Sequence, residues 1–130
     1  MDRNRIDVMW GILCVNFKVR PDDFNADCAY RLEWGWHHKA LITMRVAFND
    51  SLADAVITNM TNIAVEEGKS YDAYRNQGLG TLALGNLKTT LKTARCTIGA
   101  AQVQTPSESF WLKNGFEPLN NSTNDYIYKG

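Results

Sequence analysis

The sequence predicts one α/β (α+β) domain, built on a mixed, mainly antiparallel, twisted sheet with helices on both faces. Residues 38–48 and 53–65 alternate like strands and flank an Asn-Asp-Ser turn, which predicts an antiparallel hairpin. An amphipathic pattern over 78–95 then separates this hairpin from a strand-like run at 96–103, which predicts a parallel crossover. A length of 130 residues suits a single domain, which we expect to span 1–130.

The N-terminal part predicts a strand followed by a helix. Residues 6–18 are rich in β-branched and aromatic side chains, which favour a strand. Pro21 and the two aspartates after it are typical of a helix start, and Gly35 is typical of a helix end. An apolar stripe at four-residue spacing indicates the same helix: Phe24, Cys28 and Leu32.

The C-terminal part carries a strong helix-start signal. Thr105 as the capping residue, Pro106 at the first helical position and Glu108 three residues after the cap form a predicted capping box. Gly115 fits the left-handed position after this short helix, and Phe116 can fold back onto its last turn. Residues 124–129 predict a closing strand, which could serve as a sheet edge for a homodimer.

Composition and charge exclude several classes of protein. Lys plus Arg equals Asp plus Glu at 14 each, so we expect no general nucleic-acid binding. No apolar run approaches the roughly 20 residues of a membrane helix, and we recognise no signal peptide. The widely spaced Cys14, Cys28 and Cys96 predict reduced, mostly buried thiols rather than disulfides or a zinc site, so we expect no metal and a cytoplasmic location.

A glycine motif precedes the 78–95 helix, in the run Arg75-Asn76-Gln77-Gly78-Leu79-Gly80-Thr81. The N–H groups of a first helical turn have no intrahelical acceptor, and glycines let a ligand approach the backbone. Together with the positive helix end, these donors predict an anion site suited to a pyrophosphate, with Arg75 at its rim. The spacing fits neither the P-loop nor the dinucleotide fingerprint.

The run from Arg75 to Gly80 resembles the Arg/Gln-x-x-Gly-x-Gly/Ala motif of the GNAT superfamily of acyl-CoA N-acyltransferases. The run Ser109-Phe110-Trp111-Leu112-Lys113-Asn114-Gly115-Phe116 is similar to the short helix ending in Gly-Phe that the family has one strand later. The resemblance covers about residues 56–119. It implies a GNAT-like sheet with a parallel, V-shaped splay between its two central strands.

The resemblance also implies an acetyl-CoA-dependent N-acetyltransferase, in which a primary amine of a small molecule or peptide attacks the thioester directly. A backbone N–H at the end of the first strand of the V would polarise the carbonyl. The implied residues in contact with coenzyme A are Ile63, Val65, Arg75, Asn76, Gln77, Gly78, Leu79, Gly80, Thr81, Phe110 and Trp111.

The sequence departs from the family in its acid and base. Many members have a general-acid Tyr where this chain has Trp111, and an indole cannot deliver a proton at neutral pH. Some members keep a Glu in the fourth strand, which here has no carboxylate. Glu66 and Glu67 beyond that strand are candidate bases or a solvated acidic loop, and Tyr126 is a candidate acid or a core residue. The alternative function is a coenzyme A-binding or inhibitory protein without turnover.

The segment from Trp34 to His38 lies where the family builds its acceptor side. Its tryptophans predict packing or a pocket wall, and either His37 or His38 could act as a base near neutral pH.

Overall fold

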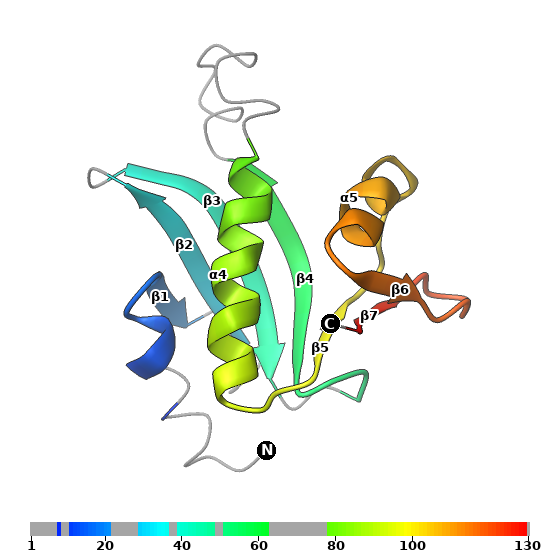
Figure 1. Cartoon of the computed structure of the whole chain (residues 1–130), viewed down its shortest axis with the longest axis horizontal. Coiled ribbons are helices and arrows are strands. Elements are labelled where there is room, and N and C mark those ends of the chain that lie inside the picture. The colour runs from blue at the N-terminus through cyan, green and yellow to red at the C-terminus, as the bar shows by residue number, and fades with distance from the viewer. Residues whose placement is uncertain are drawn as a thin grey trace.

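The structure, a computed structural model, describes residues 8, 11–21, 29–36, 39–48, 51–62 and 78–129. Within these ranges the chain forms one seven-stranded sheet in the order β1-β2-β3-β4-β5-β7-β6 (Figure 1). The strands are β1 (Lys18–Pro21), β2 (Ala29–Trp36), β3 (Lys39–Phe48), β4 (Ala55–Asn62), β5 (Ile98–Ala100), β6 (Phe116–Pro118) and β7 (Tyr126–Tyr128). The helices are α4 (Leu79–Thr93), the 3-10 turn η1 (Thr105–Ser107) and α5 (Glu108–Lys113).

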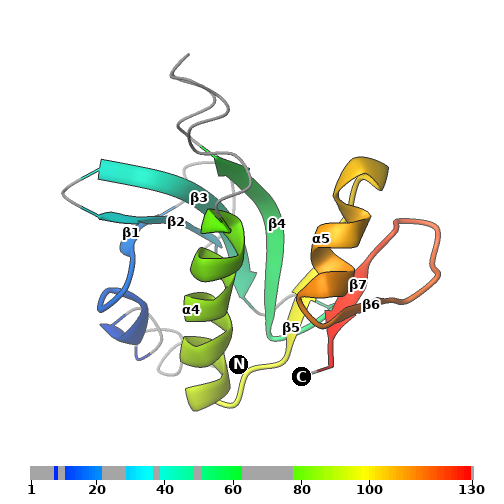
Figure 2. The ribbon, with the colours of Figure 1, turned by 45° about the horizontal axis from the view of Figure 1, so that its top comes forward.

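The predicted hairpin is confirmed as β3 and β4, which pair antiparallel. Alternate residues of β3 face the core, where Ile42, Met44, Val46 and Phe48 are all buried. Helix α4 packs against β3, and both views show it lying across the sheet beside β3 and β4 (Figure 2). The predicted helix over 78–95 is therefore confirmed, and Leu84, Leu87 and Leu91 are fully buried. The amphipathic pattern also predicts Leu82 for the buried face, which is wrong because this residue is 52% exposed.

The predicted parallel splay is also confirmed. β4 and β5 pair parallel only from Ala55–Ile98 to Ile57–Ala100, and the Ala101 N–H donates the last bond, to the Ile57 carbonyl at 3.0 Å. At the closed end, the Thr97 N–H donates to Asp54 Oδ2 at 3.0 Å and the Asp54 N–H donates to Thr97 Oγ1 at 2.8 Å. Beyond Ile57, β4 continues to Asn62 and curves away from β5 (Figure 2).

The strand predicted over 6–18 is wrong for the described residues of that range before Lys18. Val8 and residues 11–13 are helical, a turn follows, and the strand begins only at Lys18. Leu13 and Phe17, four residues apart, are both buried, and the Phe17 N–H bonds to the Leu13 carbonyl at 2.9 Å. Burial of Leu13 and Phe17 in the core overrides the β-propensity of the segment.

The helix predicted to start at Pro21 is also wrong where it can be compared. Pro21 is the last residue of β1 and pairs with Tyr30 of β2, while residues 22–28 lie outside the described ranges. Leu32, read as the third member of a helical stripe, belongs to the period-two set Tyr30, Leu32 and Trp34 that β2 buries. Gly35 lies inside β2, next to a register shift, and ends no helix.

The capping box predicted at Thr105 does not form. Residues Thr105–Ser107 make a 3-10 turn with Gln104 as its N-cap, and neither this turn nor α5 has a side-chain cap. Instead the Ser107 hydroxyl donates to the Gln104 carbonyl at 3.0 Å. The end of α5 is as predicted: Gly115 has φ 89°, and the Phe116 ring packs edge-on against Trp111 at 5.0 Å.

The closing strand is confirmed as β7, but its predicted role as a sheet edge is wrong. β7 lies between β5 and β6, so that the edges of the described sheet are β1 and β6. The reason is the additional strand β6, which pairs antiparallel with β7 directly after α5. The prediction of mostly buried thiols holds for Cys96 and is wrong for Cys14, which is exposed.

Two glycines offer a matched test of these packing arguments. We expect Gly115→Ala to cost about 1–2 kcal/mol because φ is 89°. The new Cβ would also lie 2.9 Å from Tyr128 Cε1. Gly85→Ala, in the interior of α4 with nothing within 4 Å of a new Cβ, should instead stabilise the protein by about 0.5–1 kcal/mol. Urea unfolding of both variants checks the signs, and a stabilised Gly115→Ala would contradict the structure.

Candidate functional site

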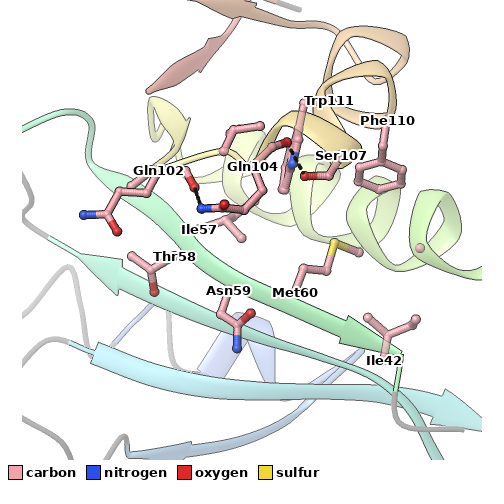
Figure 3. Close-up of a pocket in the computed structure, with 13 residues that line it drawn as sticks. Ile42, Ile57, Thr58, Asn59, Met60, Gln102, Gln104, Ser107, Phe110 and Trp111 are labelled. Atoms are coloured by element: carbon pink, nitrogen blue, oxygen red, sulfur yellow. Dashed lines mark hydrogen bonds between the residues drawn. The ribbon is translucent and has the colours of Figure 1, made fainter. Parts of the chain in front are cut away.

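A cleft with a volume of about 480 Å³ opens where β4 leaves β5 (Figure 3). β4 forms one side of it, and the segment that continues from β5 into α5 forms the other. Its lining consists of Ile42 of β3, residues 57–60 of β4, Gly80 of α4, residues 101–104, and Ser107, Phe110 and Trp111.

A β-bulge in β4 explains why the cleft opens at this point. Arg45 of β3 pairs with Asn59 and the next residue, Val46, pairs with Ile57, so Thr58 is an extra residue in β4. Thr58 Oγ1 accepts a hydrogen bond from Arg45 Nη1 at 2.9 Å and donates to the Arg45 carbonyl at 3.4 Å. A bulge bends its strand, and this one follows immediately after the last hydrogen bond to β5.

The start of α4 confirms the structural setting predicted for the glycine motif. Gly78 is the N-cap with φ 71° and ψ 18°, a left-handed conformation that favours glycine. The Leu82 N–H bonds to the Gly78 carbonyl at 2.9 Å, so the N–H groups of residues 79–81 precede the first intrahelical bond. The first turn has no acidic side chain, and its positive end favours an anion.

Gly80 connects this helix start to the cleft. A Cβ at this position would lie 3.3 Å from Phe110 Cε1 and 3.5 Å from Met60 Cε, so the glycine allows the close approach of α4 to both side chains. The structure therefore brings together Gly78, Leu79, Gly80 and Thr81 at the helix start with Phe110 and Trp111 on the opposite wall. The other predicted cofactor-contacting residues, Ile63, Val65, Arg75, Asn76 and Gln77, lie outside the described residues.

Lys88 of α4 contacts the end of α5, the helix that carries Phe110 and Trp111 of the cleft wall. Its Nζ donates to the Asn114 carbonyl at the end of α5 at 2.9 Å and lies 4.9 Å from the centre of the Tyr128 ring. Partial burial lowers the pKa of this lysine. A cation at a helix C-terminus complements the helix dipole, so this contact stabilises α5 as well as tying it to α4.

The predicted catalytic residues have different outcomes. Glu66 and Glu67 lie outside the described residues. Tyr126 is buried and is not among the described residues that line the cleft. Burial, followed by the nearby Glu108 carboxylate and a hydrogen bond to it, raises the pKa of Tyr126. The structure therefore places Tyr126 in the core beside α5, outside the described lining of the cleft.

Trp111 occupies the cleft wall as a packed aromatic residue. It is 7% exposed and meets Phe110 and Phe116 edge-on, at centroid distances of 5.3 and 5.0 Å. None of the described lining residues has an ionisable side chain. The polar groups among them are neutral: Thr58, Asn59, Gln102, Gln104 and Ser107. This described part of the cleft can position a ligand by shape and hydrogen bonds, and it supplies no general acid or base.

Sequence reasoning missed Gln102 and Gln104, which line the cleft just after β5 ends. Gln102 has φ 54°, and its N–H donates to Asp125 Oδ1 at 3.0 Å, while Gln104 Nε2 donates to the Gln102 carbonyl at 3.2 Å. The available signal was their place in the chain, because ligands bind outside the carboxyl ends of strands at a switch point of a sheet.

The chain is similar to known proteins in its structure but not in its sequence. No family model matches the sequence, and no curated protein sequence matches it. Among solved structures, ElaA from Escherichia coli is similar with a TM-score of 0.59 and 14% identity, over 96% of this chain and 88% of that one. An acetyltransferase from Thermus thermophilus gives a TM-score of 0.58 and 11% identity over 78% of this chain, which spans only 62% of that protein's length.

A GNAT family acetyltransferase from Elizabethkingia anophelis, solved with acetyl-CoA bound, gives a TM-score of 0.50 and 14% identity, over 86% of this chain and 95% of that one. The sheet order, the splay between β4 and β5 and the similarity to these structures define the fold class. It is the fold of the acyl-CoA N-acyltransferases. More particularly, this chain has the GNAT fold. Within the described ranges, none of the helices is long and apolar enough to cross a membrane.

Asp125 gives the site a pH-dependent contribution to stability. A short hydrogen bond from Thr123 (2.6 Å), then the Gln102 N–H and Asn121, hold the pKa of this carboxyl below its ordinary value of 3.8. A depressed folded-state pKa stabilises the fold above the unfolded value, and that contribution is lost as pH falls from about 4 through the folded-state pKa. We expect Asp125→Asn to flatten this part of the pH–stability curve measured by thermal unfolding. An unchanged acid limb would contradict the assignment.

Proposed function

We propose that this chain is an acetyl-CoA-dependent N-acetyltransferase whose acceptor is a primary amine of a small molecule or peptide. The observation that carries the proposal is the cleft at the β4–β5 splay, with the start of α4 opening onto it at Gly80. The GNAT fold supports the proposal, since the compared proteins include acetyltransferases and one of them holds acetyl-CoA.

The start of α4 would hold the pyrophosphate of the cofactor. The N–H groups of residues 79–81 precede the first intrahelical bond and lie at the positive end of a 15-residue helix. The pantetheine arm would then lie in the cleft between Met60 and Phe110 on its way towards Thr58. The edge of β4 beyond Ile57 has no paired residue in β5, so its backbone groups are available to the amides of that arm.

The chemistry is a direct acyl transfer. The neutral amine nitrogen attacks the thioester carbonyl carbon, and the resulting tetrahedral intermediate expels the coenzyme A thiolate as the amide forms. The ammonium proton leaves to water or to a base, and the thiolate takes up a proton. A thiol has a pKa of about 8.5, so its thiolate leaves without a strong general acid, and Trp111 does not prevent the reaction. Backbone donors and the fixed geometry of the two reactants would provide most of the acceleration.

A second candidate function is coenzyme A binding without turnover. It is favoured by one observation, the buried Trp111 at the position where many GNAT enzymes have an acidic Tyr. Acetyl-CoA binding without transfer to any amine in a broad acceptor screen would select this function over the enzyme.

A negative charge in the first turn of α4 tests whether this turn binds the cofactor or has only a structural role. Thr81 is exposed at the third helical position. We expect Thr81→Glu to leave the fold intact or slightly stabilised, because a carboxylate suits a helix N-terminus. The same charge should weaken acetyl-CoA binding at least about tenfold by repelling the pyrophosphate.

Calorimetric titration with acetyl-CoA measures this effect, with desulfo-coenzyme A and a truncated cofactor lacking the pyrophosphate as ligand controls. Thr81→Gln controls for side-chain size, and Thr89→Glu adds the same charge to an exposed position far along the same helix. Equal acetyl-CoA affinities for wild type and Thr81→Glu would show that the pyrophosphate does not bind at the start of α4.

The pH dependence of turnover tests the absence of a base from the described lining. We expect kcat/KM to rise with pH as the acceptor ammonium loses its proton, with a midpoint that follows the pKa of the acceptor itself. Two acceptors of similar shape and different pKa should therefore give different midpoints. The same midpoint near pH 6–7 for both would instead show that an enzyme group takes the proton.

A further inference from the structure

We propose that a second groove, which borders the cleft at Gln102, is the acceptor subsite and binds a neutral hydroxyl or carboxamide group carried near the reacting amine. This inference rests on the proposed function and deepens it. The groove has a volume of about 340 Å³ and shares Gln102, Val103 and Gln104 with the cleft. Its remaining lining is Thr105 and residues 122–124 of the loop between β6 and β7.

The position of the groove relative to the cofactor favours the acceptor. In the cleft, Met60 and Phe110 lie at the end near α4, while Thr58 and Gln102 lie at the other end (Figure 3). A cofactor with its phosphates at Gly80 therefore presents its acyl end towards Thr58 and Gln102. The groove begins at Gln102, so that a ligand held there can reach the acyl carbon with its amine.

Hydrogen bonds fix the two walls of the groove relative to each other. The Val103 N–H donates to the Asn124 carbonyl at 3.0 Å, and Asn124 Nδ2 donates to the Val103 carbonyl at 2.8 Å. Asp125 accepts from the Gln102 N–H at 3.0 Å and from Thr123 Oγ1 at 2.6 Å. Gln102 has φ 54°, which a residue of this type keeps only where its surroundings hold it. These contacts fix both walls before a ligand arrives, which reduces the entropic cost of binding.

The chemistry of the lining identifies the class of group that it binds. Every residue that lines the groove, except Val103, carries a hydroxyl or amide side chain. Asn124, Thr123 and Gln104 use these groups to hold the walls. Within the described residues, the side chains of Gln102, Thr105 and Ser122 form no hydrogen bond, so they remain available to a ligand. Neutral donors and acceptors match hydroxyl and carboxamide groups, each of which both donates and accepts.

A matched set of acceptors tests the assignment. We compare an amino alcohol, an amino-acid amide, an alkylamine of similar size and a diamine, each with saturating acetyl-CoA. The amino alcohol and the amino-acid amide should have the lower KM values, and the better of the two identifies the source of the neutral group. In the double variant Thr105→Val/Ser122→Ala, their KM should rise about three- to tenfold for each hydrogen bond lost. The KM of the alkylamine should not change.

Ser109→Ala is the matched control, because Ser109 is an exposed hydroxyl residue of α5 outside both linings. An alkylamine preferred to the hydroxyl and amide compounds, or a double variant that raises all KM values equally, would overturn the proposal. Acetyl-CoA affinity by calorimetry should be the same in all these variants.

A binding measurement keeps this inference separate from the proposed enzyme function. Amide NMR shifts are recorded while the amino alcohol or the amino-acid amide is added to the protein. Shifts confined to residues 102–105 and 122–124, and lost in the double variant, would support the groove even if no acetyl transfer occurs. Absence of shifts at these residues, with and without coenzyme A, would refute the groove whether or not the protein turns over other amines.

Discussion

The single constraint on which the site depends is the end of the β4–β5 ladder. The bond from the Ala101 N–H to the Ile57 carbonyl is the last between the two strands, and the bulge at Thr58 follows at once. A bulge bends its strand, so β4 turns away while β5 ends. Backbone groups on the inner edge of β4 then have no strand partner, and buried backbone groups without partners are costly. In the proposed function, the extended, amide-containing arm of the cofactor would pair with these groups.

The same constraint explains the place of α4. Parallel strands need a crossover connection, and α4 returns along the sheet between β4 and β5. The first of these two strands is the bent one. Leu84, Leu87 and Leu91 fix the helix on the sheet, because all three are fully buried. The first turn of α4 is therefore held at the open side of the V, where Gly80 lines the cleft. Gly80 and Phe110 then bring the wall of α5 into contact with that turn.

The parts of the fold that were predictable from sequence are those marked by local pattern. The β3–β4 hairpin, α4 and the left-handed Gly115 each have a signal within a few residues, and all three form as predicted. β2 was missed because Leu32 fits both a period of four and a period of two, and only pairing with Met44 decides between them. The polar wall was missed because Asp125 contacts Gln102 across 23 residues of sequence, and a positive φ in a non-glycine residue leaves no sequence mark.

The neutral side chains that line the cleft and the contacts that fix its wall both suit the proposed reaction. A thiolate leaves without strong acid assistance, so the costly part of the proposed reaction is bringing an uncharged amine and a thioester together in the correct orientation. Phe116 packs against Trp111 and Asp125 accepts from the Gln102 N–H, so that residues outside the cleft lining restrain both of these lining residues. A carboxylate at the same place that did not itself take up the proton would instead raise the pKa of the acceptor amine and favour its protonated, unreactive form. In the proposed reaction, neutral hydrogen-bonding walls would leave the acceptor amine free to lose its proton, and they would select acceptors by shape and by their hydroxyl or amide groups.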